Sequence, residues 1–206
     1  ETEILTIRYC TCFQKLCRFI ISMTYYTLNF NAGNLGAGSI YLNFFLSGLV
    51  ELPAHILIIF TIDRLGRKII HSCMLIFCGM ACLLCVLEII LAPEGYQWLA
   101  IVLAMMSKFG VTGAFSTIYL YSSELFPTVI RHSALGASSS WARLGAMLAP
   151  FVAAQGASLN PTLGRSVPLL ISGCLSLMAG LLACLLPETL NRKLPETLSD
   201  AKKFTK

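Results

Sequence analysis

Charged side chains are scarce in this chain of 206 residues: Asp, Glu, Lys and Arg make up 12% of it, against about a quarter in a typical soluble domain. Hydrophobic residues make up 56%, and the mean hydropathy is +0.75. This composition excludes an ordinary soluble domain and indicates an integral membrane protein. The net charge of +5 does not indicate a nucleic-acid partner, because no nucleic-acid-binding motif accompanies it.

Other signatures are missing as well. No GxxxxGK[ST] loop is present, so ATP-driven pumping has no support. The chain starts at Glu1, without an initiator methionine or a signal-peptide pattern, and we expect a fragment of a longer protein or a truncated gene model. None of the nine cysteines falls in a predicted external loop, which argues against a disulfide framework. Cys78, Cys82 and Cys85 share a helix face without metal-binding partners, so we expect them to pack; no metal or cofactor is predicted.

Six apolar stretches are each long enough for the roughly 20 residues that a helix needs to cross a hydrocarbon core about 30 Å thick. Their predicted limits are 16–34, 39–62, 69–91, 96–120, 132–156 and 167–186. The fold class is therefore an all-α membrane protein. We expect a cytoplasmic segment at 1–15, a six-helix bundle at 16–186 and a cytoplasmic tail at 187–206.

The basic residues alternate between the two sides of these spans. They precede the first span, follow the second and fourth, and fill the tail: Arg8, Lys15, Arg18, Arg64, Arg67, Lys68, Arg131, Arg192, Lys193, Lys202, Lys203 and Lys206. The opposite connections contain one basic residue, Arg165. By the positive-inside rule, both termini of this chain lie in the cytoplasm.

Polar residues inside the spans point to function. In the second span, four of them recur every four residues and line one helix face: Asn43, Ser47, Glu51 and His55. The first and fourth spans carry similar polar and aromatic sets: Ser22, Tyr25, Tyr26 and Asn29, and Lys108, Thr112, Phe115, Ser116 and Tyr119. Ionisable residues within membranes usually face a bundle interior or a water-filled cavity and mark a substrate or ion pathway.

Arg143 lies near the middle of the fifth span, within the stretch SSSWARLGAMLAPF at 138–151. An arginine keeps its charge, so it needs an anion or water. We expect it to face a central cavity, where it meets a substrate carboxylate or Glu51. Structural interpretations stay open for the other ionisable residues: Glu51 as a hydrogen-bond acceptor between helices, His55 as a neutral packing residue and Lys108 at a helix end.

Three short connections carry a more specific pattern: TIDRLGRK at 61–68, YSSELFPTVIR at 121–131 and LPETLNRKLPET at 186–197. In this order and spacing they resemble the carboxyl-terminal half of the major facilitator superfamily, and within it solute carrier family 22, the organic cation, anion and carnitine transporters. The stretches GLVELPAHILI, KFGVTGAFSTIYLYSSELFPTVIR and ARLGAMLAPFV extend the likeness across nearly the whole chain.

The resemblance implies a carrier of twelve helices in two halves, located in the plasma membrane, with the substrate site between the halves. This chain would supply one half, and its missing partner would be the N-terminal half. The resemblance also gives the loop charges a gating role. Ion pairs at the helix junctions hold the cytoplasmic ends together in one state, and the residues concerned are Asp63, Arg64, Gly66, Arg67, Lys68, Glu124 and Arg131.

The substrate class stays open between an organic cation, a carnitine-like zwitterion and an organic anion. Arginine at position 143 resembles the anion and carnitine members, KFGVTGAFS resembles the carnitine branch, and DRLGRK resembles invertebrate members described as organic cation transporters. In a zwitterion site, Arg143 would take the carboxylate, while rings would hold a quaternary ammonium: Tyr25, Tyr26, Phe115 and Tyr119.

Three other classes have less support. An intramembrane serine protease lacks a GxSx nucleophile pattern and a base in a later span, so no catalytic residue and no enzyme activity are predicted. A channel subunit would conduct without saturation, whereas a carrier saturates. A truncated carrier that regulates a full-length partner is the third alternative, and upstream transcript sequence would decide it.

Overall fold

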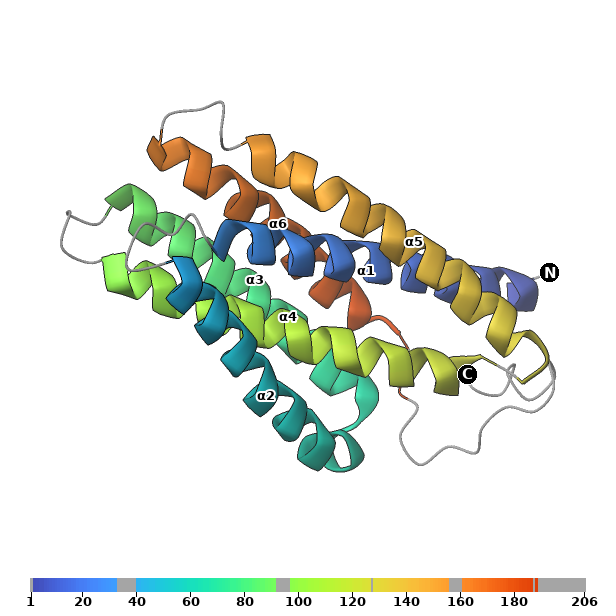
Figure 1. Cartoon of the computed structure of the whole chain (residues 1–206). Helices are drawn as coiled ribbons and strands as arrows, with labels where there is room; N and C mark the ends of the chain where they lie inside the picture. The colour runs from blue at the N-terminus through green and yellow to red at the C-terminus, as the bar shows by residue number, and fades with distance from the viewer. Residues whose placement is uncertain are drawn as a thin grey trace.

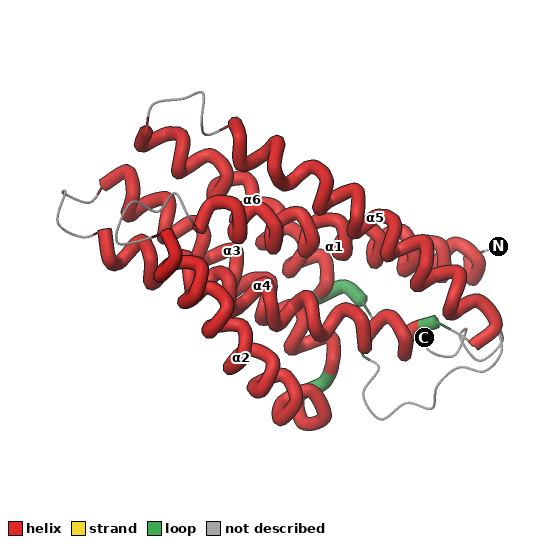
Figure 2. The backbone as a smooth tube through the Cα atoms, viewed as in Figure 1, coloured by secondary structure: helices red, strands yellow, loops and turns green. Residues whose placement is uncertain are grey.

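Helices account for almost all of the chain that the computed structural model describes, namely residues 2–32, 40–91, 97–126, 128–155, 161–186 and 188 (Figure 2). Within these residues there are six helices: α1 (Thr2–Ala32), α2 (Ile40–Leu65), α3 (Arg67–Leu91), α4 (Gln97–Leu125), α5 (Thr128–Gln155) and α6 (Pro161–Ala183). The prediction of six helices is confirmed in number and order. Each helix extends beyond its predicted limits at one end, most of all α1, because backbone hydrogen bonding continues where the apolar sequence stops, whereas α6 ends at Ala183, before its predicted limit.

The turn between α2 and α3 consists of Gly66 alone. Its φ of 96° lies in the left-handed region, which glycine adopts at little cost. The chain therefore reverses within one residue, and the charged residues on either side of the glycine are held at one end of the bundle.

Four helices are long and apolar enough to cross a membrane over the residues that the structure describes: α2, α3, α4 and α6. The other two, α1 and α5, carry more polar residues. In α1 these side chains lie inside the bundle, since Ser22, Thr24, Thr27 and Asn31 are all buried. A helix with a polar composition can therefore still lie in a membrane, because its polar side chains face the bundle interior.

The helices form two layers. Figure 1 shows α5, α1, α4 and α2 following one another across the bundle, and the contacts of α1 with α5 and α4, and of α4 with α2, agree with this order. Helices α3 and α6 pack extensively against each other and cover α4 and α1 from behind. The central pair, α1 and α4, thus contacts both layers.

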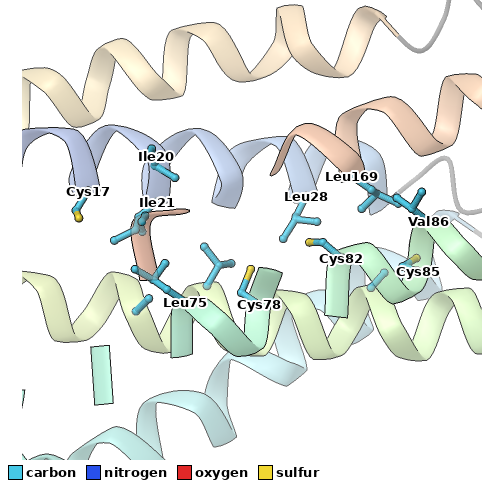
Figure 3. Packing of buried hydrophobic residues seen from close by; sticks show 14 of the residues in the cluster. Cys17, Ile20, Ile21, Leu28, Leu75, Cys78, Cys82, Cys85, Val86 and Leu169 are labelled. Carbon is cyan, nitrogen blue, oxygen red and sulfur yellow. The ribbon is translucent and has the colours of Figure 1, made fainter. Parts of the chain in front are cut away.

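The core lies between α1, α3, α4 and α6 (Figure 3). Cys78, Cys82 and Cys85 are completely buried there, which confirms that these thiols act as packing residues. Cys17 of α1 is also part of this core.

Glycine allows two close helix contacts, as is common in membrane bundles. A Cβ atom on Gly79 of α3 would lie 2.9 Å from the carbonyl oxygen of Gly173 on α6. On α5, a Cβ atom on Gly145 would overlap the carbonyl oxygen of Phe19 on α1. Gly136 has nothing within 4 Å of a Cβ position, because it lies on a different face of α5 from Gly145.

Candidate functional site

Lys108 of α4 is buried and surrounded by groups from two other helices. Its Nζ lies 3.0 Å from Oε1 of Glu51 on α2 and donates a hydrogen bond to the side-chain oxygen of Asn29 on α1. The ammonium group also lies 4.0 Å from the centre of the Tyr25 ring. The lysine therefore has an anion, an amide oxygen and an aromatic face as partners.

Tyr25 closes this cluster, because its hydroxyl donates to Oε1 of Glu51 over 2.8 Å. Tyr25 and Asn29 are one turn apart on α1, so both reach the same level of α4. The cluster of Lys108, Glu51, Tyr25 and Asn29 ties together three neighbouring helices. Lys108 and Glu51 neutralise each other there.

A row of rings leads away from this cluster. The Tyr25 and Phe115 ring centres are 5.5 Å apart, and the Phe115 and Tyr119 centres are also 5.5 Å apart. Such separations are typical of attractive ring pairs. We call Tyr25, Phe115 and Tyr119 the aromatic row. At its far end the guanidinium of Arg18 lies 4.2 Å from the centre of the Tyr119 ring.

A small, partly open pocket with room for about one water molecule, about 10 Å³, adjoins Lys108. Its lining comes from α1, α2, α4 and α6, and consists of Leu28, Asn31, Ser47, Ala104, Met105, Lys108 and Leu169. Most of these side chains are apolar, and Lys108 is the charged one. The pocket therefore places an apolar surface next to the polar cluster.

Three predicted residues lie outside the cluster. Ser116 donates to the backbone oxygen of Thr112, so its hydroxyl is used within α4. Tyr26 is exposed and meets Tyr25 edge to face, with 5.4 Å between ring centres. His55 is exposed and its Nδ1 lies 2.7 Å from the backbone oxygen of Glu51.

The position of His55 follows from helix geometry. Residues four apart are rotated by about 40° around an α-helix with 3.6 residues per turn, so four such residues cover about 120°. Asn43 and Ser47 are buried against the bundle, Glu51 is half-buried, and His55 has turned outward. The four polar residues of α2 are therefore buried at the start of the series and exposed at its end, at His55.

Arg143 is exposed on α5, and among the described residues no ion pair includes it. The face of α5 toward α1 is buried at Ser138, Ala142, Gly145 and Ala149. Arg143 follows Ala142 and is therefore turned about 100° away from it. Of the two partners expected for Arg143, Glu51 is paired with Lys108 in this structure.

A second charged cluster lies at the end of the bundle where α2 turns into α3. Arg67 reaches Asp63 of α2 at 3.1 Å and Glu124 of α4 at 3.1 Å, and it also donates to the backbone oxygen of Ile62 at 3.3 Å. One guanidinium therefore joins three helices. The predicted grouping of Asp63, Gly66, Arg67 and Glu124 is found at one place.

Glu188, which follows α6, joins this cluster. Its Oε1 accepts hydrogen bonds from the backbone nitrogens of Arg67 at 3.0 Å and Lys68 at 3.4 Å. These are the first two residues of α3, whose amides have no partner within the helix. Sequence reasoning missed this role. The signal was that no Ser, Thr, Asp or Asn precedes α3 to cap it, so a distant acid does so.

The remaining predicted gate residues contribute less. Arg64 is exposed. Arg131 donates to the backbone oxygen of Phe126 at 3.2 Å rather than pairing with Glu124, because Arg67 occupies that carboxylate. Lys68 takes part through its backbone nitrogen.

These features define a class: a helical membrane protein with a neutralised charge pair and aromatic rings inside its bundle and an ion-pair cluster at one end. The chain belongs to the Major Facilitator Superfamily, whose family model matches residues 10–205.

Known relatives confirm the likeness to solute carrier family 22. The chain is 43% identical over 188 residues to the organic cation transporter protein of Drosophila melanogaster, covering 91% of this chain and 32% of that protein. It is 37% identical to solute carrier family 22 member 3 of Rattus norvegicus, covering 96% and 34%. It is 39% identical to organic anion transporter 3 of Sus scrofa, covering 90% and 32%. The chain thus spans about a third of the length of these relatives.

Proposed function

We propose that this chain supplies one half of a carrier that moves small organic ions across a membrane by alternating access. The N-terminal half of the carrier would be its partner, and the substrate would bind between the halves. In this proposal the carrier lies in the plasma membrane, with both termini of this chain in the cytoplasm. Membership of the superfamily and the relatives described as organic cation and anion transporters support it.

One observation favours an organic cation or a carnitine-like zwitterion as the substrate. Glu51 neutralises Lys108, so the polar cluster has no free positive charge to offer, while the adjoining aromatic row has ring faces that attract cations. In the zwitterion form of this proposal, the exposed Arg143 can take the carboxylate across the gap between the halves.

The cluster around Arg67 is the proposed gate. It links α2, α3 and α4 at one end of the bundle through contacts of about 3 Å that a small relative movement of the helices would break. Carriers that rock between two states need such contacts, which form in one state and open in the other.

An organic anion transporter is the alternative. The relative described as organic anion transporter 3 and the exposed guanidinium of Arg143 favour it. The two alternatives differ in a measurable way, since an anion carrier would transport a carboxylate that has no positive charge.

Uptake in cells expressing the complete carrier tests the proposal. The probes are carnitine, tetraethylammonium and an aromatic monocarboxylate, each in the wild type and in the variants Arg143→Ala, Phe115→Leu and Phe109→Leu. Phe109 is the matched control, because it lies on the same helix but packs against Phe77, with ring centres 6.4 Å apart. Loss of one cation–π contact of about 1–2 kcal/mol should raise the KM for tetraethylammonium roughly 5- to 30-fold in Phe115→Leu.

The outcomes separate the classes. Saturable uptake of a probe with a positive charge, weakened in Phe115→Leu and unchanged in Phe109→Leu, supports the cation or zwitterion carrier. Loss of carboxylate uptake in Arg143→Ala makes Arg143 a substrate ligand. Uptake of the monocarboxylate alone supports the anion carrier, and no saturable uptake of any probe refutes the carrier proposal.

A further inference from the structure

Arg18 and Lys108 are the two buried cations among the side chains that the structure describes. The sequence groups Arg18 with the basic residues that set topology, but α1 continues past it on both sides and its side chain is buried. Its Nη2 donates to Oγ of Ser122 on α4 over 2.9 Å, and its guanidinium lies 4.2 Å from the centre of the Tyr119 ring. Its buried Nε has no hydrogen-bond partner.

No carboxylate among the described side chains pairs with Arg18. Glu51 pairs with Lys108, and Asp63 and Glu124 pair with Arg67. Glu188 caps α3, and Glu88 lies at the opposite end of the bundle. Glu3 precedes Arg18 by 15 residues on the same helix, which is about 22 Å at 1.5 Å per residue.

The neutral groups around Arg18 do not replace a carboxylate. Gln14 donates its amide to Ser122, and its buried Oε1 has no partner. Ser122 lies in the last turn of α4, where the helix dipole contributes only about half a negative charge. A guanidinium keeps its proton in proteins, so the positive charge stays largely uncompensated. Removing such a charge from water without an anion is strongly unfavourable.

The Arg18 side chain does not extend to the water at the membrane surface either. A snorkelling arginine extends its guanidinium into water. Here Tyr119 and Ser122 enclose the guanidinium, and Arg18 is only 2% exposed. The guanidinium is therefore held inside the bundle by neutral groups.

We propose that Arg18, with Ser122 and Gln14, forms a subsite for the carboxylate of the transported substrate at the end of the aromatic row. The inference rests on the proposed carrier function and specifies its substrate as a short zwitterion. Its positive group would lie against Phe115 and its carboxylate on Arg18. The Tyr119 ring, which lies against the guanidinium, is 45% exposed.

The dimensions fit such a molecule. The Phe115 and Tyr119 ring centres are 5.5 Å apart, and the guanidinium lies 4.2 Å beyond the latter, so Phe115 and Arg18 are at most 9.7 Å apart. A bound ammonium group can lie up to about 6 Å from a ring centre, so a zwitterion with charges roughly 4–6 Å apart, such as carnitine, can reach both groups. Arg143 belongs to a different helix, so the two arginines can be tested separately.

The test compares uptake of carnitine and tetraethylammonium by the complete carrier with Arg18→Gln, Arg18→Lys and Lys15→Gln. Lys15→Gln is the matched control, since it removes one positive charge from the same helix at a half-buried position outside the row. We expect the KM for carnitine to rise roughly tenfold or more in Arg18→Gln, because a charge-assisted pair is lost. Arg18→Lys should recover part of the affinity, and Lys15→Gln should match the wild type. The KM for tetraethylammonium should not rise in Arg18→Gln.

A binding measurement covers the case in which Arg18→Gln transports poorly for structural reasons. Carnitine should raise the Tm of the purified wild-type carrier, raise it less for Arg18→Lys and not raise it for Arg18→Gln. An unchanged KM for carnitine, or equal losses for both probes at equal surface amounts, overturns the subsite. Failure of the wild type to transport either probe would instead refute the carrier function itself.

Discussion

Removal of the Glu51 carboxylate should destabilise the bundle more than removal of the Lys108 ammonium group, although the two groups form one ion pair at 3.0 Å. The reason is unequal burial, since the lysine side chain is 3% exposed and the glutamate side chain 27%. Glu51→Gln leaves a buried cation without its anion. Lys108→Met leaves a carboxylate that water can reach and that the Tyr25 hydroxyl still bonds.

The magnitudes follow from this asymmetry. Breaking a buried pair so that a charge is left behind costs about 3–5 kcal/mol. The Asn29 oxygen and the Tyr25 ring remain with Lys108 and offset part of this, with a cation–π contact contributing about 1–2 kcal/mol. We therefore expect a loss of roughly 2–3 kcal/mol for Glu51→Gln. For Lys108→Met we expect about 0–1 kcal/mol, in line with the modest couplings of polar groups within membranes.

Thermal unfolding of the purified, detergent-solubilised protein measures the difference. At about 2–4 °C per kcal/mol, Glu51→Gln should lower the Tm by roughly 4–12 °C and Lys108→Met by no more than about 4 °C. The double variant should resemble Lys108→Met, because neither substitution then leaves an unpaired buried cation at position 108. Equal losses in the two single variants, or a larger loss in Lys108→Met, would refute the argument from burial.

Three further predictions concern helix contacts. Gly145→Ala should lower the Tm by several degrees because its Cβ overlaps the α1 backbone, whereas Gly136→Ala, with open space around it, should leave the Tm unchanged or higher. Gly66→Ala and Glu188→Gln should each lower the free energy of unfolding by about 1 kcal/mol. The double variant should lose less than the sum of the two, since the alanine Cβ would lie 2.8 Å from the Glu188 carboxylate. A double-mutant cycle in thermal unfolding measures this coupling. Arg67→Lys keeps the charge but cannot reach two carboxylates with one planar group, so uptake should fall at normal surface amounts.

Hydrophobic length and residue periodicity predicted much of this structure. They identified six helices and placed Lys108 and Glu51 on inward faces of α4 and α2. They did not predict that these two residues pair, because periodicity describes each helix alone and the partner depends on which helices become neighbours. The order in which the helices lie side by side, with α1 and α4 at the centre, depends on how they pack against one another and cannot be read from any single helix.

The sequence was least informative where a residue lies near the end of an apolar stretch. Arg18 is two residues inside the predicted limit of the first span, so hydropathy treats it as a charge at the membrane surface. The helix in fact begins at Thr2, which carries Arg18 into the bundle beside α4. The same cause explains Glu188: its position after the last span indicated a tail, while its partner amides are at the start of α3.

Arg18 and Lys108 together limit what the aromatic row can bind. The Phe115 ring centre lies at most 9.7 Å from the Arg18 guanidinium, so a simple cation against this ring would lie roughly 10 Å from Arg18. At an effective dielectric constant of about 20, this separation gives a repulsion of about 1.7 kcal/mol, comparable to the gain of about 1–2 kcal/mol from a cation–π contact. Lys108 adds little, because Glu51 neutralises it. A substrate that brings its own carboxylate to Arg18 turns the repulsion into attraction, so the row favours a zwitterion over a simple cation of the same size.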